Sequence, residues 1–520
     1  MKKSQSNALQ FRFALVAIIA ALALLFGFTS PLSAQPVLGA QNTALGGGGT
    51  AYLSGNEAIF WNPANLAIND RYGTIHINVG HGGILYSPVL SSNVADDQFN
   101  SFTDSYFPYS ADAVQITPDQ RLTIIDENYP RRRLVSEHQS RSDVLLGALS
   151  WQKRNETFSI AARARYSSRI EVGRGWYSTE FVDRGDQQIR DFTLNQHINQ
   201  NLEIALGYAR EFSFLEGLFP RLNKLYVGFS PKFIIAGPHF NATYTGQQQR
   251  TDENDPGRYV SDFSYRATGE YSNMTIDYLS SGNSRAAINN NLNKKINFDP
   301  TGYGAAIDFG LTYLIPIGSD LNLLEDDLEK SVVQKSLRIS VSFNDIGIIR
   351  YTQQPIDITA SQDTVQIGTE PPRNEMFIGS GGQYLTYFDD ASEITNPFSH
   401  NQNPNDNSFS APTPATLNSG IMLDLNRLKF MGDLTIGLNN SSFTNTKLTM
   451  HLGLEARPIH RIPLRVGTRL AAGVPTYVGF GTGYESRYWD FNVGTQIIFR
   501  SHTFTTEVVG GAFAGLQFHL

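Results

Sequence analysis

The stretch TFSIAARARYS, residues 157–167, alternates apolar and polar side chains along its length. Its apolar face consists of Phe158, Ile160, Ala162, Ala164 and Tyr166, and its other face includes Ser159, Arg163, Arg165 and Ser167. Successive side chains of a β-strand point to opposite faces, so this period of two predicts a strand. Two arginines interleaved with apolar residues fit the wall of a membrane β-barrel, with Arg163 and Arg165 in a watery lumen and the apolar residues in lipid.

Other charged residues occupy the lumen-facing positions of similar segments. They are Asp308, Arg338, Arg465 and Arg469. An arginine on the lipid face would cost roughly 2–4 kcal/mol at the bilayer midplane, so these charges indicate which face of each strand points inward. Arg210 is an exception, because it shares its face with apolar neighbours. It ends its segment, where a long side chain can reach the membrane interface.

About fourteen segments show this pattern, each close to the ~10 residues that a tilted strand needs to cross a bilayer. They cover residues 72–79, 143–152, 157–170, 201–212, 224–236, 303–314, 336–350, 418–428, 433–439, 447–457, 463–471, 477–486, 488–499 and 511–520. Short connections at 153–156, 431–432 and 458–462 alternate with long loops at 80–142, 237–302 and 351–417. Short turns lie in the periplasm of such barrels and long loops lie outside. The sequence therefore predicts an all-β transmembrane antiparallel barrel over residues 72–520, with both termini in the periplasm.

Composition excludes several other classes of protein. Only 17% of the residues are charged and 12% are aromatic, whereas about a quarter of the residues of soluble globular proteins are charged. Beyond the first 34 residues no run of 18 apolar residues occurs, which excludes a helical membrane bundle. The 41 Lys+Arg against 48 Asp+Glu create no basic field, so we expect no nucleic-acid partner. The absence of cysteine excludes disulfides, thiolate metal sites and a lipid-modified cysteine.

Residues 1–34 predict a cleaved secretory signal peptide. Basic residues precede an apolar run at 13–28, which leads to small residues ending at Ala34. The run is shorter than the ~20 residues that span a bilayer, so we expect export without a helical anchor. The mature chain is then expected to begin near Gln35 and to reside in the cell outer membrane, with its lipid as the surrounding partner.

Residues 35–71 precede the first predicted strand. They include the sequence ALGGGGTAYLSGNEAIFWNPANLA, residues 44–67. The glycines at 46–49 permit tight bends and positive φ angles, and Asn56 is placed to cap a short helix through Phe60. The Asn62-Pro63 pair ends that helix, because the residue before proline avoids the helical region. Such a segment is predicted to fold back into the lumen as a plug, or hatch.

This opening resembles the N-terminal hatch of the FadL-type outer-membrane transport family, and still more closely that of the PorV-like and related barrels. The residues that carry the resemblance are Gly46, Gly47, Gly48, Gly49, Asn62, Pro63 and Ala64. The segments SFNDIGIIRY, residues 342–351, and YGAAIDFGLTY, residues 303–313, look like wall segments of the same group. The resemblance implies a barrel of about fourteen strands with the N-terminal segment inside it as a hatch.

The resemblance leaves two functions open. FadL-like members carry hydrophobic small molecules across the outer membrane, which implies a passive conduit gated by residues 35–71. PorV-like members receive exported cargo in the type IX secretion system, which implies a non-conducting scaffold or cargo-receiving subunit of a cell-envelope complex. The long polar loop at 395–416 departs from the FadL-like pattern. The inward arginines fit either function, since they line a wet passage or lock a closed interior through ion pairs with Asp308 or Glu171.

For two further segments, the sequence predicts contacts with other proteins. The C-terminal segment 511–520 has one apolar face, formed by Ala514, Leu516, Phe518 and Leu520, and a strand of this kind suits the barrel assembly machinery of outer membranes. The sequence of residues 319–335 predicts a short amphipathic helix that packs beneath the barrel or binds a periplasmic partner. No Gly-x-Ser-x-Gly motif occurs and the acidic loops lack the spacing of a calcium loop. We therefore expect no enzyme, no cofactor and no metal site.

Overall fold

The computed structural model describes the larger part of the chain. The described residues are 39–68, 73–86, 119, 122, 125–126, 128–129, 132–153, 155–212, 223–255, 257–273, 276, 299–317, 335–359, 364–365, 408–444, 446–471, 476–499 and 510–520. The predicted signal peptide, residues 319–334 of the predicted amphipathic helix and residues 395–407 of the polar loop lie outside them.

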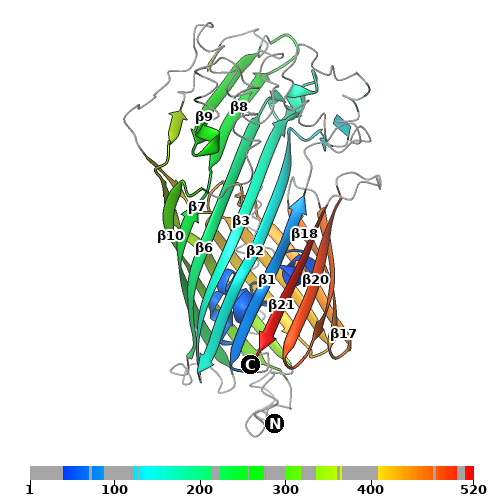
Figure 1. The fold of residues 1–520 in the computed structure, drawn as a ribbon. Coiled ribbons are helices and arrows are strands. Elements are labelled where there is room, and N and C mark those ends of the chain that lie inside the picture. Colours follow the sequence, from blue (N-terminus) through cyan, green and yellow to red (C-terminus); the bar gives the residue numbers. More distant parts are fainter. Residues whose placement is uncertain are drawn as a thin grey trace.

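Fourteen antiparallel strands form a closed barrel (Figure 1). These wall strands are β1 (Ile75–Tyr86), β2 (Val135–Lys153), β3 (Glu156–Gly173), β6 (Leu194–Phe212), β7 (Lys224–Ala236), β10 (Gly302–Pro316), β11 (Ser336–Tyr351), β15 (Thr416–Asp424), β16 (Leu428–Gly437), β17 (Thr449–Ile459), β18 (Ile462–Ala471), β19 (Thr476–Glu485), β20 (Trp489–Phe499) and β21 (Gly510–His519). The first and last strands close the cylinder, since Ile77 lies opposite Phe518 of β21 and Leu149 of β2. The predicted fold class is confirmed.

No helix within the described ranges is long and apolar enough to cross a membrane.

The predicted alternation divides each wall strand between an inner and an outer face. In β3, Arg163 is 1% exposed and points inward, whereas Ile160 is 44% exposed on the outer face. In β10, Asp308 is fully buried and the adjacent Phe309 is 47% exposed. Arg210 lies on the outer face as predicted, at the end of β6, where its guanidinium is 3.3 Å from Glu156 Oε1.

A β-bulge interrupts the pairing of β10 with β11. Ile307 pairs with Ile346 and Phe309 with Phe343, so Asp308 faces both Asn344 and Asp345. Asp345 has a φ of 55°, a left-handed conformation that aspartate tolerates better than most residues. The extra residue directs two carboxylates into the lumen at the same level.

One predicted turn is wrong. Residues 431–432 lie inside β16, and the chain turns instead at 425–427, between β15 and β16. Asn426 adopts a φ of 73° there, which asparagine accommodates because its short polar side chain bonds locally. Its backbone N–H donates to Asp424 Oδ1 at 2.9 Å. The predicted turns at 153–156 and 458–462 do join consecutive wall strands.

The three predicted long loops contain strands that the alternation test missed. Loop 80–142 includes the end of β1 and the start of β2, and loop 237–302 includes β8 (Phe240–Arg250) and β9 (Arg258–Ala267). Loop 351–417 includes β12 (Ile356–Thr359), β13 (Thr364–Val365) and β14 (Phe409–Pro412). Strands outside the lipid need no apolar outer face, and β8 accordingly carries glutamine at 247–249.

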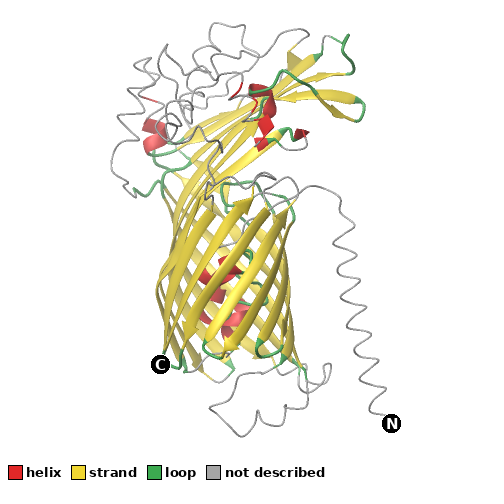
Figure 2. Ribbon diagram, turned by 90° about the vertical axis from the view of Figure 1, so that its right-hand side faces the viewer, coloured by secondary structure: helices red, strands yellow, loops and turns green. Residues whose placement is uncertain are grey.

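Strands β2, β3 and β6 continue past the rest of the wall and carry an additional sheet. β6 pairs with β7 along the barrel and with β8 above it, and β4 (Val182–Arg184) and β5 (Gln187–Asp191) join through β8. We call this part, with β9, β12 and β13, the extended sheet. Figure 2 shows it projecting from one end of the barrel, here named the extended end. The other end, the short-turn end, holds the C-terminus.

The segment at residues 39–68, here named the plug segment, lies inside the barrel toward the short-turn end (Figures 1 and 2). It contains α2 (Ala40–Ala44) and two 3-10 helices, η1 (Gly55–Phe60) and η2 (Pro63–Ala67). Its residues form no strand pair with the described wall. The predicted helix cap at Asn56 is wrong, because Ser54 is the N-cap of η1. The Asn56 amide instead donates to His76 O of the wall at 2.8 Å.

Substitution of the lipid-facing Phe309 by arginine should lower the free energy of unfolding of the barrel by roughly 2–4 kcal/mol, because the charge would meet hydrocarbon near mid-wall. Guanidinium titration in phospholipid vesicles measures this loss. The matched variant Arg210→Leu, at a strand end with an exposed ion pair, should change stability by less than about 1 kcal/mol. Equal losses in both variants would contradict the assigned outer face.

Acidification should weaken the extended sheet through His239, which lies between β7 and β8. Burial lowers the pKa of His239 from its ordinary 6.5 to about 3, and the charge of Arg266 adds to this effect. As the pH falls, the unfolded chain therefore binds a proton at a higher pH than the folded chain does. The contribution of neutral His239 to the free energy of unfolding is present above about pH 6.5 and is lost as the pH falls toward about 3. Protease susceptibility of β8 and β9 across that range measures the loss. The variant His239→Asn should show a shallower pH dependence, and an identical profile would refute the assignment.

Candidate functional site

The glycine loop of the plug segment lies in backbone contact with the wall. Gly46 has a φ of +78°, and a Cβ there would overlap the backbone of Thr468. The wall also presents a glycine at this contact, since a Cβ on Gly467 would overlap Leu45. Gly47 follows with a φ of 90°. Gly46 and Gly47 thus adopt positive φ angles that glycine tolerates and most residues do not. Gly46 also lies too close to the backbone of Thr468 for a side chain.

Two side chains of the wall hold the same loop by its polar backbone groups. Asp433 of β16 accepts hydrogen bonds from the N–H groups of Gly49 and Thr50, the second at 2.8 Å. A Cβ on Gly48 would lie 2.8 Å from both Asp433 Oδ2 and the Cβ of His451, so a larger residue does not fit. His451 Nδ1 donates to the carbonyl of Gly46 at 2.8 Å. Asp433 accepts two of these hydrogen bonds and His451 donates one, so Asp433 contributes most to this attachment.

The Asn-Pro-Ala motif attaches the second half of the plug segment. Asn62 is the N-cap of η2 and accepts from the N–H of Ala64 at 3.2 Å. Its amide also donates to Thr312 Oγ1 of β10 at 2.9 Å. A Cβ on Gly228 of β7 would overlap the carbonyl of Pro63. The motif therefore ends one helix, begins the next and binds two wall strands.

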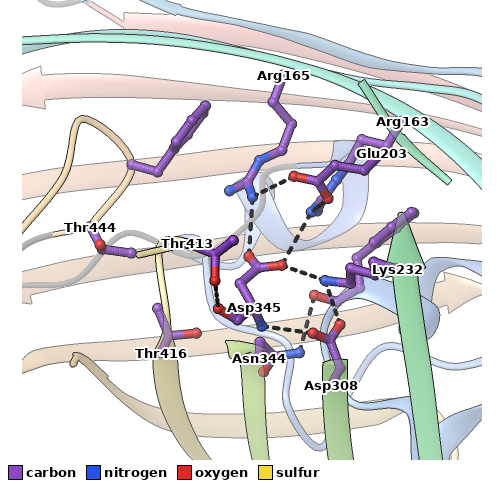
Figure 3. A network of polar contacts seen from close by, with 12 residues as sticks. Arg163, Arg165, Glu203, Lys232, Asp308, Asn344, Asp345, Thr413, Thr416 and Thr444 are labelled. Carbon is purple, nitrogen blue, oxygen red and sulfur yellow. Dashed lines mark hydrogen bonds and ion pairs between the residues drawn. The ribbon is translucent and has the colours of Figure 1, made fainter. Parts of the chain in front are cut away.

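A layer of paired charges lies against Phe60 of η1, and Figure 3 shows its ion pairs around Asp345. Arg163 pairs with Glu203, and Arg165 Nη1 lies 3.2 Å from Glu203 Oε1 and 3.1 Å from Asp345 Oδ2. These side chains are almost fully buried. Replacing one partner of a buried ion pair costs about 3–5 kcal/mol, because the other charge is then left without compensation.

Lys232 and Asp308 complete the layer. Lys232 Nζ lies 2.6 Å from Asp308 Oδ2 and also pairs with Asp345. The backbone N–H of Asp345 donates to Asp308 Oδ1 at 2.7 Å, so the bulge and the ion pairs support each other. With Arg141 and Asp143, which pair at 2.5 Å, the layer holds four basic and four acidic side chains and carries no net charge. The basic members are Arg141, Arg163, Arg165 and Lys232, and the acidic members are Asp143, Glu203, Asp308 and Asp345.

The predicted Arg465 belongs to a second cluster near the plug segment. Its guanidinium lies 2.8 Å from Glu455 Oε2 and 2.9 Å from Glu485 Oε1. Tyr52 of the plug segment donates to Glu455 Oε2 at 2.5 Å and accepts from Arg465 Nε at 2.9 Å. Arg469 covers the ring of Tyr477 at 3.4 Å from the centroid. Through Tyr52, the plug segment is therefore also attached to β17 and β18.

The predicted inward residues are buried, but their partners differ from those considered in the sequence. Asp308 pairs with Lys232 rather than with an arginine, and Glu171 lies 3.7 Å from Arg169, further toward the extended end. Arg338 is 2% exposed on the inner face of β11. Sequence reasoning did not single out Lys232, although its inward parity was visible beside Ser230.

Three other partners were missed: Asp143, Glu203 and Asp345. The inward parity of Asp143 and Glu203 can be read from their own segments. Asp345 follows the bulge, which reverses the parity of β11, so simple alternation misplaces it.

Two phenylalanine rings enclose the charge layer. Phe60 of η1 lies beneath it, with the Arg163 guanidinium 3.9 Å and the Lys232 ammonium 5.2 Å from the ring centroid. Phe443 of the β16–β17 connection lies above it, 4.2 Å from the guanidinium of Arg165. A cavity of about 40 Å³ remains beside Phe60, bordered by Arg163. That volume is room for a few water-sized molecules, not for a drug-sized ligand.

The fold and the interior together define a transmembrane β-barrel that holds residues 39–68 in its lumen. Residues 75–495 match the family described as "Family of unknown function (DUF5723)". The match covers most of the chain, and the chain belongs to this family.

A search of the curated proteins found no match. Among solved structures, the chain is similar to the toluene transporter TbuX of Ralstonia pickettii, at 11% identity over 93% of this chain and 99% of that one, with a TM-score of 0.40. It is similar to the toluene transporter TodX of Pseudomonas putida, at 10% identity over 94% and 98% of the two chains, with a TM-score of 0.36. It is also similar to the CymD monoaromatic hydrocarbon channel, at 12% identity over 93% and 96%, with a TM-score of 0.37. The resemblance to PorV-like barrels stays a prediction.

The variant Asp433→Ala should loosen the plug segment without unfolding the wall. It removes the acceptor of two buried backbone hydrogen bonds, and each N–H left without an acceptor costs about 1–3 kcal/mol. Hydrogen exchange of residues 39–68 should then accelerate at least about tenfold.

The matched control for this variant is Asp183→Ala, which removes an exposed carboxylate in the extended sheet. It should leave hydrogen exchange of the plug segment unchanged. Unaltered protection of the plug segment in Asp433→Ala would show that this anchor does not hold it.

Proposed function

We propose that this protein is an outer-membrane conduit for small hydrophobic solutes, gated by the plug segment. The observation that carries the proposal is the way the plug is attached. It meets the wall through side chains and close glycine contacts, and its residues make no strand pairs with the described wall. It is therefore able to leave or shift without breaking the hydrogen-bonded ladder of the barrel.

Several features of the chain fit an outer-membrane location. Large apolar side chains cover the outer face of the wall, among them Ile160, Phe309 and Leu464. The predicted signal peptide provides for export, and the apolar face of β21 suits the barrel assembly machinery. Because short turns lie in the periplasm of such barrels, the short-turn end faces the periplasm and the extended end faces the outside.

A non-conducting scaffold, or a cargo-receiving subunit of a secretion or cell-envelope complex, is the second candidate. Two observations favour it. The inward charges are paired and buried, which is the arrangement of a locked interior. The extended sheet offers a folded platform beyond the barrel for a protein partner. The two candidates differ in whether the lumen ever opens.

Ion conductance across planar lipid bilayers separates the two candidates. Conductance is the suitable readout, because hydrophobic solutes also cross phospholipid unaided. The variants are a deletion of residues 41–66, a replacement of residues 441–444 by four glycines, and the two combined.

The conduit predicts steady conductance after deletion of residues 41–66, and more in the combined variant, because the plug segment and Phe443 close the lumen from opposite sides. The unchanged protein should stay closed. A combined variant that keeps its β-sheet circular dichroism but conducts no ions would exclude the conduit, and proteins co-purifying from native membranes would then support the scaffold.

A further inference from the structure

The connection between β16 and β17 enters the lumen from the extended end. Its residues 441–444 form a compact turn, in which Ser441 N–H donates to Thr444 O at 2.7 Å and Thr444 N–H donates to Ser441 Oγ at 3.0 Å. We call these four residues the inserted turn. At its tip, the ring of Phe443 is 1% exposed. A loop at a barrel mouth ordinarily lies on the surface. The burial of Phe443 therefore indicates that the wall forms a binding site for its ring.

Two guanidinium groups form that ring site. The centroid of Phe443 lies 4.2 Å from the Arg165 guanidinium carbon and 5.7 Å from that of Arg141. A desolvated cation over an aromatic face contributes on the order of 2 kcal/mol. The site therefore selects a planar π-system over an aliphatic group of similar size.

Donors of the wall converge on one carbonyl next to the ring. The carbonyl oxygen of Ser442 accepts from Gln139 Nε2 of β2 at 2.7 Å and from Ser167 Oγ of β3 at 2.6 Å. Asn199 Nδ2 of β6 donates to Ser442 Oγ at 2.9 Å. Each of these wall side chains is used as a donor to the turn. The wall thus recognises an aromatic ring and an adjacent hydrogen-bond acceptor together.

The charge balance of the layer restricts what else fits there. Arg141 is paired with Asp143, and Arg165 is shared among Asp143, Glu203 and Asp345. Arg169, which contacts the turn, lies 3.7 Å from Glu171. Since the layer is already neutral and Arg169 has an acidic partner, a bound carboxylate would add an uncompensated buried charge, which is costly. An uncharged acceptor, such as an amide or ketone carbonyl, adds no charge and satisfies both donors.

We propose that the inserted turn occupies a ligand site in the closed barrel, and that the ligand is an uncharged aromatic compound with a carbonyl acceptor beside its ring. The ligand binds Arg165 and Arg141 through the ring and Gln139 and Ser167 through the carbonyl, and it displaces the turn. This site would place aryl amides and aryl ketones among the solutes of the proposed conduit, and to that extent it rests on the proposed function.

The turn is built to leave as a unit. Its internal hydrogen bonds join Ser441 to Thr444 and do not involve the wall. Its hydrogen bonds to the wall all come from wall side chains: those from Gln139, Ser167 and Asn199 to Ser442, and one from Arg169 Nη1 to the carbonyl of Thr444 at 2.9 Å. Displacement therefore exchanges the hydrogen bonds of Gln139 and Ser167 for equivalent ones made by the ligand and releases those of Asn199 and Arg169, and the strand ladder is unaffected.

Calorimetric titration of the full chain with residues 441–444 replaced by glycines tests the site, with benzamide, toluene and benzoate as probes. Benzamide should bind at least about tenfold more tightly than toluene, because it gains two hydrogen bonds to Gln139 and Ser167. Benzoate should bind no better than toluene. Equal binding of benzamide and toluene, tightest binding of benzoate, or no binding at all would overturn the proposal.

Two further measurements support this titration. Adding Gln139→Ala and Ser167→Ala to the glycine variant should abolish the preference for benzamide and leave toluene binding intact. In the unmodified protein, saturating benzamide should accelerate hydrogen exchange of residues 438–444, and unchanged protection there would overturn the proposal even if the glycine variant does not fold. Binding does not depend on conductance, so a failed conduit and a failed ligand site give different results.

Discussion

The pairing of inward-facing charges is the constraint on which the interior of this barrel depends. A fourteen-stranded wall is wide enough to enclose more than its own side chains, and here the plug segment fills the space that water would occupy. Charges that alternation places inside the wall are thus removed from bulk water and require partners. Asp345 is the centre of this arrangement, because it joins Arg165 to Lys232. The β-bulge that orients Asp345 is accordingly part of the charge layer and not an irregularity of one strand.

The closure has two sides that rest on different contacts. Beneath the charge layer, Phe60 belongs to a segment fixed by Asp433, His451 and the Asn-Pro-Ala motif. Above it, Phe443 belongs to a turn fixed by donors of three neighbouring strands. Within the described residues, neither element contributes to the hydrogen-bonded ladder of the wall. The stability of the barrel and the state of its lumen are therefore separable properties.

Sequence patterns predicted the strands of the fold that have a lipid-facing side. The membrane requires an apolar outer face, so wall strands such as β3 and β10 were recognisable from their period of two. The extended sheet lies beyond the barrel. The polar residues of its strands β8 and β9 show no such period, so the sequence pattern predicts a loop there. The turn at Asn426 was misplaced to 431–432, since Leu425 and Leu428 flank the true turn and continue the apolar pattern of the first strand through it.

The candidate site was predictable in its inward residues but not in its contacts. Parity identified Arg163 and Arg165 as inward, yet their partners come from strands far apart in sequence, and Glu203 and Asp345 meet them only when the cylinder closes. The cap assigned to Asn56 failed for the same reason, because its amide binds the wall and not its own helix. The role of Phe443 depends on a turn entering the lumen, which no local pattern indicates.

The central claim is that alternate side chains divide between lipid and a sealed interior, and the absence of cysteine makes it directly measurable. Single cysteines introduced at residues 305–313 of β10, carrying a spin label in lipid vesicles, report contact with lipid-soluble oxygen and with a water-soluble nickel complex. The account predicts oxygen accessibility that alternates with a period of two, high at 305, 307, 309, 311 and 313, and little access for either reagent at the intervening positions. Uniform oxygen accessibility along the strand, or free access of the nickel complex to the inner positions of the intact protein, would contradict it.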